Sequence, residues 1–130
     1  MKPNARNIVL PANVRFAFLI GLLLLIEGIW ELFSPVVFGV LTSNPLHGLV
    51  HLLFAVVAIW AGRGGHARVF LVFFGLFAIA LAALWYFPRT NTLMVRLLNM
   101  NRPVAYAHGF VGVLSLLVAS SSPGPRIRAR

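Results

Sequence analysis

The sequence contains no cysteine and only two acidic residues, Glu27 and Glu31. The lack of cysteine excludes disulfide bonds, thiolate catalysis, cysteine-ligated zinc or iron–sulfur clusters and covalently attached haem. There is also no aspartate to orient a histidine beside a nucleophilic serine, and any carboxylate chemistry must use one of the two glutamates. We therefore expect that the protein is not an enzyme.

Charge is scarce throughout the chain. Charged residues make up 10% of the 130 residues against 60% hydrophobic residues, and the mean hydropathy is +0.92. A soluble domain of this size needs a far more polar surface, so we expect an integral membrane protein. The net charge is +9, but the basic residues flank apolar segments instead of forming one stripe. The expected partner is therefore the lipid bilayer with its anionic headgroups, and not nucleic acid.

The apolar residues fall into four segments. Each is about as long as a helix that crosses ~30 Å of hydrocarbon, and all are too continuously apolar for barrel strands. The segments cover residues 16–33, 46–62, 69–87 and 103–119. The first contains Glu27 and Glu31 and is followed by no small-residue cleavage site, so we expect it to stay as a helix and not to be removed as a signal peptide.

The expected fold is all-α, an integral membrane four-helix bundle over residues 16–119. A basic N-terminal segment, residues 1–15, precedes it, and a basic disordered tail, residues 120–130, follows. Eight lysine and arginine residues lie in the two terminal segments and the loop around residue 65, against three in the loops on the other side. Because basic residues favour the cytoplasm, both termini are predicted to be cytoplasmic, in a multi-pass protein of the cell (inner) membrane.

The longest loop lies between the third and fourth segments. Its centre, TLMVRLLNM, fits either a short amphipathic helix on the outer surface or an irregular loop. The eleven phenylalanines are interpreted as bulk that faces lipid.

The stretch NPLHGLVHLL opens the second segment with Asn44, Pro45, His47, His51 and Leu52 in the pattern Asn-Pro-x-His-x-x-x-His-Leu. This pattern resembles a large family of small bacterial four-helix membrane proteins, known as domain of unknown function four-three-eight-three. The resemblance implies a four-helix membrane fold over about residues 14–119. It implies no established activity.

The entry to the fourth segment carries a second part of the resemblance. Asn101 and His108 match residues that the family tends to carry there, whereas Val104 and Ala105 stand where the family has an Asp-Asn pair. Any role in the family that depends on that acid is therefore not implied for this chain.

The ionisable residues of the segments are expected to meet. At a rise of ~1.5 Å per residue, Glu27, His51 and His108 lie within ~5 Å of the bilayer centre, and Glu31 and His47 lie one turn further out. All five fall in the same, outer half of the bilayer. Small residues at helical spacing mark the faces that pack together. These are Ala55, Ala58, Gly75, Ala78, Ala82, Gly112 and Ser115. We expect a buried cluster of two carboxylates and three imidazoles.

Four roles for this cluster remain open. It could be structural, with glutamate–histidine hydrogen bonds between helices and with Arg89, Arg96 or Arg102 pairing to Glu31. It could bind a divalent metal through His47, His51, His108, Glu27 and Glu31. It could hold a b-type haem between His51 and His108. It could relay protons or line an ion path. The structural role leads, and it implies a structural or accessory protein, as a subunit of a membrane complex or as a homo-oligomer.

Overall fold

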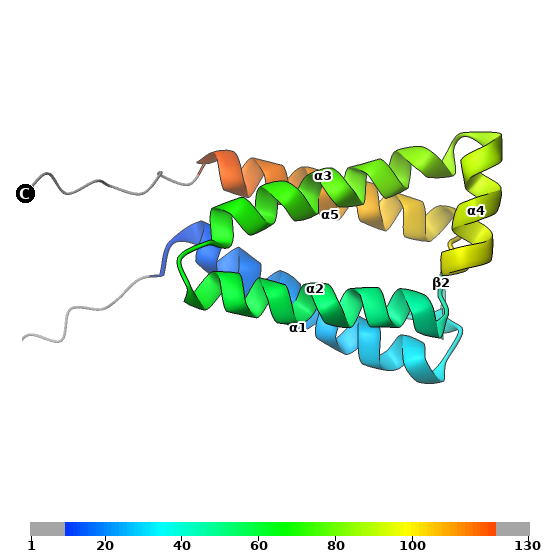
Figure 1. Cartoon of the computed structure of the whole chain (residues 1–130), viewed down its shortest axis with the longest axis horizontal. Coiled ribbons are helices and arrows are strands. Elements are labelled where there is room, and N and C mark those ends of the chain that lie inside the picture. The colour runs from blue at the N-terminus through cyan, green and yellow to red at the C-terminus, as the bar shows by residue number, and fades with distance from the viewer. Residues whose placement is uncertain (1–9, 122–130) are drawn as a thin grey trace, which may run out of the picture.

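The computed structural model describes residues 10–121, and its chain is almost entirely helical (Figure 1). The N-terminal residues 1–9 lie outside the described part, as does the predicted tail, residues 120–130, except for its first two residues, which belong to the last helix. The helices are α1 (Ala12–Phe33), α2 (Pro45–Arg63), α3 (Ala67–Trp85), α4 (Pro88–Leu98) and α5 (Arg102–Ser121). Two strands of two residues each, β1 (Val36–Val37) and β2 (Leu41–Thr42), pair antiparallel between α1 and α2.

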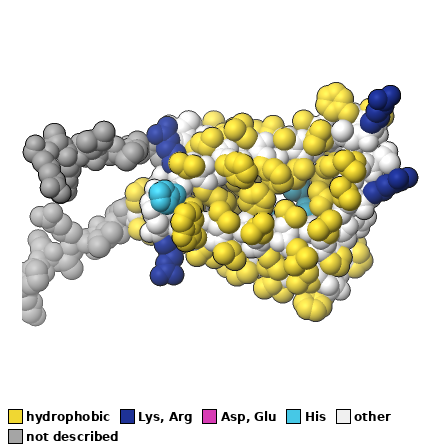
Figure 2. All heavy atoms as spheres, in the orientation of Figure 1, with side chains coloured by type: hydrophobic (Ala, Val, Ile, Leu, Met, Phe, Trp, Pro, Cys, Tyr) yellow, Lys and Arg dark blue, Asp and Glu magenta, His cyan; other side chains and the backbone are white. Residues whose placement is uncertain are grey.

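Four of the helices fit a membrane. α1, α2, α3 and α5 have 19 to 22 residues and mean hydropathies of 1.6 to 2.4. At ~1.5 Å per residue such helices match ~30 Å of hydrocarbon. Figure 2 shows hydrophobic side chains over the middle of the molecule and basic side chains at its two ends. The predicted all-α, four-helix membrane fold is confirmed.

The first residue of α1 and the last residue of α5 lie at the same end of the bundle (Figure 1). This follows from an even number of crossings. The cytoplasmic orientation of that end stays a prediction.

The helix ends follow local chemistry. α2 begins where the sequence indicates, because Pro45 occupies the first turn and the Asn44 side chain accepts a hydrogen bond of 2.9 Å from the His47 amide. α3 ends at Trp85, two residues before the expected end, because a new helix begins at Pro88. This new helix, α4, shows that the long loop contains a short helix and is not irregular throughout. Its Met94 side chain is buried against the bundle.

The long helices associate in two pairs, α1 with α2 and α3 with α5 (Figure 1). In each pair the backbones touch at facing glycines. A methyl group on Gly28 would lie 2.9 Å from the Gly48 carbonyl oxygen, and one on Gly75 would lie 2.9 Å from the Gly112 carbonyl oxygen. Small residues allow this close approach in lipid, where there is no hydrophobic driving force between helices. The small residues singled out in the sequence are all buried.

The two pairs meet through larger side chains. Near the end of the bundle where α1 begins, a core of alanine, leucine and phenylalanine side chains joins all four long helices. At the other end Met94, Met100, Val104 and Ala105 form a second core with the last turn of α4. The helices thus leave a cavity between the pairs, and the predicted cluster borders it.

Candidate functional site

Two of the three clustered histidines come from α2. His47 and His51 are one turn apart, and only 2% and 9% of their surfaces are exposed. Their ring centroids lie 4.5 Å apart. The Asn44 cap holds the first turn of α2, so it also fixes the backbone of His47.

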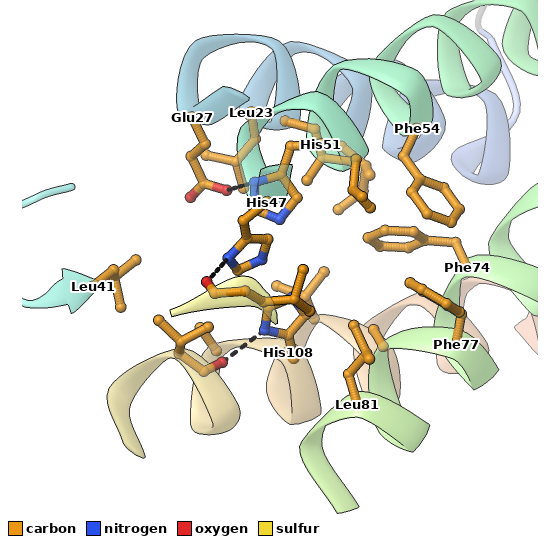
Figure 3. Close-up of a pocket in the computed structure, with 18 of the residues that line it drawn as sticks. Leu23, Glu27, Leu41, His47, His51, Phe54, Phe74, Phe77, Leu81 and His108 are labelled. Carbon is orange, nitrogen blue, oxygen red and sulfur yellow. Dashed lines mark hydrogen bonds and ion pairs between the residues drawn. The ribbon is translucent and has the colours of Figure 1, made fainter. Parts of the chain in front are cut away.

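The third histidine, His108, comes from α5 and reaches across the gap between the helix pairs (Figure 3). Its ring centroid lies 5.5 Å from that of His47, nearly parallel to it, and 6.0 Å from that of His51. One ring nitrogen from each of the three histidines lies within 4.8 Å of the other two. The structure therefore gathers three imidazoles from two helices that belong to different pairs.

Each imidazole presents its Nδ1 atom to an oxygen. Nδ1 of His47 lies 3.1 Å from the Leu98 carbonyl oxygen, and Nδ1 of His108 lies 2.8 Å from the Val104 carbonyl oxygen. Nδ1 of His51 lies 3.0 Å from Oε2 of Glu31. A carbonyl oxygen only accepts, so the contacts of His47 and His108 favour the tautomer with the proton on Nδ1. The Nε2 atoms of these two histidines are then left with their lone pairs. The contact of His51 with Glu31 is an ion-pair distance without hydrogen-bond geometry.

The glutamates stand beside the histidines from α1. Glu31 is 5% exposed and is the nearer of the two to His51. Oε2 of Glu27 lies 3.8 Å from Nδ1 of His51 (Figure 3). The close contact of Gly28 with Gly48 brings α1 and α2 together beside the cluster, because these glycines lie next to Glu27 and His47 in the chain.

The expected pairing of Glu31 with an arginine is wrong. Among residues 10–121, the ion pairs of both glutamates are with His51. Arg89, Arg96 and Arg102 are all exposed at the end of the bundle. The side chain of Glu31 instead lies in the interior, where α1 packs closely on α2.

The C-terminal end of α4 closes the cluster on one side. Asn99 has the left-handed backbone conformation, with φ of 50°, and its side-chain amide donates to the Ser43 carbonyl oxygen. Three further side chains join this end to the loop between α1 and α2. The Asn44 amide donates to Leu97 O, the Thr42 hydroxyl donates to Asn99 O, and the Asn101 amide donates to Val40 O. This network was not predicted from the sequence, although its three asparagines beside the two longest loops were a signal.

A cavity of about 210 Å³ lies next to the cluster, between the helix pairs (Figure 3). All five predicted site residues line it at one end, and apolar side chains line the rest. Phe54, Phe74 and Phe77 are among these apolar side chains. The prediction that the phenylalanines are bulk that faces lipid is therefore wrong for these three. The expected Glu/His cluster is therefore present, and a cavity that the sequence did not predict adjoins it.

The remaining histidine, His66, is not part of the cluster. It precedes α3 and stacks on Trp60, with 5.5 Å between the ring centroids.

The comparisons with known proteins give one finding. The family model described as Domain of unknown function (DUF4383) matches residues 14–121. No curated protein and no solved structure matches the chain. The chain belongs to this family, which carries no assigned activity.

Proposed function

We propose that this membrane protein binds one divalent transition-metal ion through His47, His51 and His108. The observation that carries the proposal is Nε2 of His47, which is buried and has no hydrogen-bond partner among the described residues. A buried polar atom without a partner costs about 1–3 kcal/mol. A metal ion bound by this nitrogen removes that cost.

The arrangement of the three rings supports the proposal. Histidines that bind a metal usually donate their other ring nitrogen to a carboxylate or a carbonyl oxygen, which fixes the tautomer and the ring orientation. His47 and His108 have such an oxygen within hydrogen-bond distance of Nδ1, and Nδ1 of His51 lies 3.0 Å from a carboxylate oxygen of Glu31. Nitrogens on one zinc ion lie roughly 3.4 Å apart. One ring nitrogen of each histidine lies within 4.8 Å of the other two, so the three rings are close enough to share one ion after small rotations.

The charges also support it. Burying two carboxylates is costly unless positive charge lies beside them. Glu27 and Glu31 have only imidazoles as ion-pair partners among residues 10–121. A divalent ion bound to three neutral imidazoles balances two ionised carboxylates. Zinc is the first candidate because three imidazoles and a fourth oxygen ligand suit its tetrahedral coordination.

The same geometry favours an ion over the other ligands considered. A b-type haem needs its two axial histidines on opposite faces of a wide, flat ring. The ring of His47 lies within 5.5 Å of those of both His51 and His108, where the macrocycle would have to lie. A proton or ion path needs polar groups beyond the cluster. The cavity wall there is apolar.

A structural role is the second candidate. Glu31 and His51 join α1 to α2, and His47 joins α2 to the end of α4. These contacts fix the packing of three helices whether or not an ion is bound. In that case the protein acts as a structural or accessory component of a membrane complex, or as a homo-oligomer.

Elemental analysis of the purified protein tests the proposal. The protein is purified in detergent through a tag without histidine or cysteine, incubated with zinc and freed of excess metal. We expect about one zinc ion per chain. We expect most of it to be lost in His51→Gln and in His108→Gln, because an amide keeps a hydrogen bond but is a poor zinc ligand. His66→Gln is the matched control and keeps the zinc, since His66 stacks on Trp60.

Two results would overturn metal binding. One is protein that melts cooperatively but holds no metal after incubation with zinc, iron(II) or manganese. The other is equal zinc content in His51→Gln, His108→Gln and His66→Gln. Either result leaves the structural role as the proposed function.

We also propose the cell (inner) membrane as the location, with both termini cytoplasmic. The support is the excess of basic residues on that side of the predicted topology.

A further inference from the structure

The cavity beside the cluster has the size of a small ring compound. Its volume is about 210 Å³. A dry, apolar cavity of ~150 Å³ in another protein binds benzene. The cavity therefore has room for one six-membered ring with a few substituents.

Its wall is aromatic at the end away from the cluster. The rings of Phe54 and Phe77 have centroids 5.1 Å apart, and those of Phe54 and Phe74 are 5.5 Å apart (Figure 3). These three side chains come from α2 and α3, and they bridge the gap between the helix pairs. Aromatic side chains favour a flat guest with which they form offset or edge-to-face contacts.

The polar end selects against anions. Glu27 and Glu31 line it together with the three histidines, and none of the described lining residues is lysine or arginine. In protein without a bound metal ion, a carboxylate or phosphate placed there would meet like charge without a basic side chain to balance it. A neutral hydroxyl group, in contrast, can donate a hydrogen bond to an imidazole Nε2 or to a carboxylate oxygen, and a carbonyl group can accept one from a glutamate that is protonated.

The cavity is reached from the side of the bundle. In Figure 2 a histidine side chain is visible in a recess between the helix pairs, within the apolar face of the molecule. Phe73, which is 62% exposed, stacks on Phe54 and Phe77 of the cavity wall, so exposed apolar surface borders the cavity. Since α4 covers the end of the bundle, a guest enters from the hydrocarbon and must be soluble in it.

We propose that this cavity binds a neutral, membrane-soluble molecule with a single six-membered ring that bears a carbonyl or hydroxyl group. This is the chemistry of the head groups of single-ring quinones and of phenols. The ring lies among Phe54, Phe74 and Phe77, and its oxygen points to the histidines and glutamates. The inference goes beyond metal binding and does not depend on it, because it is based on the shape, lining and access of the cavity.

Thermal unfolding in detergent with two probes tests the inference. The probes are decylubiquinone, which has a one-ring quinone head, and 4-decylphenol, and decanoic acid serves as an anionic control. We expect saturable stabilisation, with a rise in Tm of several degrees, by at least one ring probe and none by decanoic acid. Stabilisation by one ring probe alone supports the proposal and identifies the oxygen chemistry that the site takes.

Variants that fill the cavity locate the binding. Val111 and Ala107 line the cavity on α5, whereas Val113 on the same helix is 49% exposed outside it. We expect Val111→Phe and Ala107→Leu to weaken binding at least tenfold and Val113→Phe to leave it unchanged. Ala107→Leu is the smaller change and serves if Val111→Phe does not fold.

Three results would overturn the inference: no saturable stabilisation by either ring probe, stabilisation of the metal-free protein by decanoic acid equal to that by a ring probe, or unchanged affinity in both filled variants. The titrations are made with zinc and after a chelator. Probe binding by protein that takes up no zinc on incubation refutes the metal proposal and leaves this one standing. Zinc binding without probe binding refutes this inference and leaves the metal proposal standing.

Discussion

Within the cluster, the two glutamates differ in their distance from His51. Oε2 of Glu31 lies 3.0 Å from Nδ1 of His51, and Oε2 of Glu27 lies 3.8 Å from it. A carboxylate beside a metal-binding imidazole raises the basicity of the ligand and holds the ring in place. The shorter contact is therefore expected to contribute more to metal affinity.

This difference predicts the effect of removing each charge. Glu31→Gln should lower zinc affinity about 10–100-fold, as loss of such a supporting group does in other metal sites. Glu27→Gln should lower it less. Competition with a zinc indicator measures both affinities in protein that unfolds cooperatively. A larger loss in Glu27→Gln would contradict the assigned order and would instead make Glu27 the direct ligand.

At this scale the sequence predicts the membership of the cluster but not its protonation. Spacing and depth along each helix name His47, His51, His108, Glu27 and Glu31. In His47 and His108, the ring nitrogen that carries the proton is determined by the carbonyl oxygens of Leu98 and Val104. Main-chain carbonyls have no signature in side-chain spacing, so only the folded chain identifies them.

Among the helices, the contact of α1 with α2 depends on the absence of side chains at Gly28 and Gly48. A methyl group on Gly48 would lie 2.9 Å from the Gly28 carbonyl oxygen and 2.9 Å from Cβ of Glu31. Neither is the free end of a flexible side chain, so the helices have to move apart.

We therefore expect Gly48→Ala to destabilise the protein by about 1–3 kcal/mol, as overpacking of a tight interior does. Thermal unfolding in detergent measures this. Gly109→Ala is the control, because a methyl group there meets only Cβ of Ala82 at 3.5 Å, an ordinary contact. The close packing of α1 on α2 would be refuted if Gly48→Ala and Gly109→Ala melted at the same temperature.

The four long helices could be predicted from the sequence because a membrane span has a fixed length and a continuous apolar composition. α4 could not be separated from an irregular loop. Its 11 residues are marginal as an isolated helix, and packing of Met94 against the bundle contributes to holding it. Gly75 and Gly112 could be predicted as packing residues from the sequence, but Gly28 and Gly48 were not. Only the folded structure, which shows which helices pair, distinguishes glycines at helix contacts from other glycines.

The whole molecule has two ends that differ in what covers them. One end carries the start of α1, the end of α5 and the turn between α2 and α3, and the other carries α4 and the paired strands (Figure 1). The excess of basic residues predicts that the first end faces the cytoplasm.

Because the chain has no cysteine, single cysteines test this orientation cleanly. Val40 is 59% exposed beside β2, and Ser121 is exposed at the end of α5. A membrane-impermeant maleimide should label Val40→Cys on intact cells and Ser121→Cys only after permeabilisation. The reverse pattern would invert the predicted orientation, and labelling of both from one side would refute an arrangement with four crossings.

The hydrogen bonds between the end of α4 and the loop before α2 also affect how fast a bound ion would exchange with the medium. Bonds from Asn44, Thr42, Asn99 and Asn101 cross this end, and they must open together before water reaches the cluster by that route. The sides of the bundle are surrounded by hydrocarbon, which a charged ion crosses only at great cost. An ion held by the histidines is thus expected to exchange slowly with the medium. Such a protein retains what it acquires during assembly and does not act as a buffer that follows changes in ion concentration.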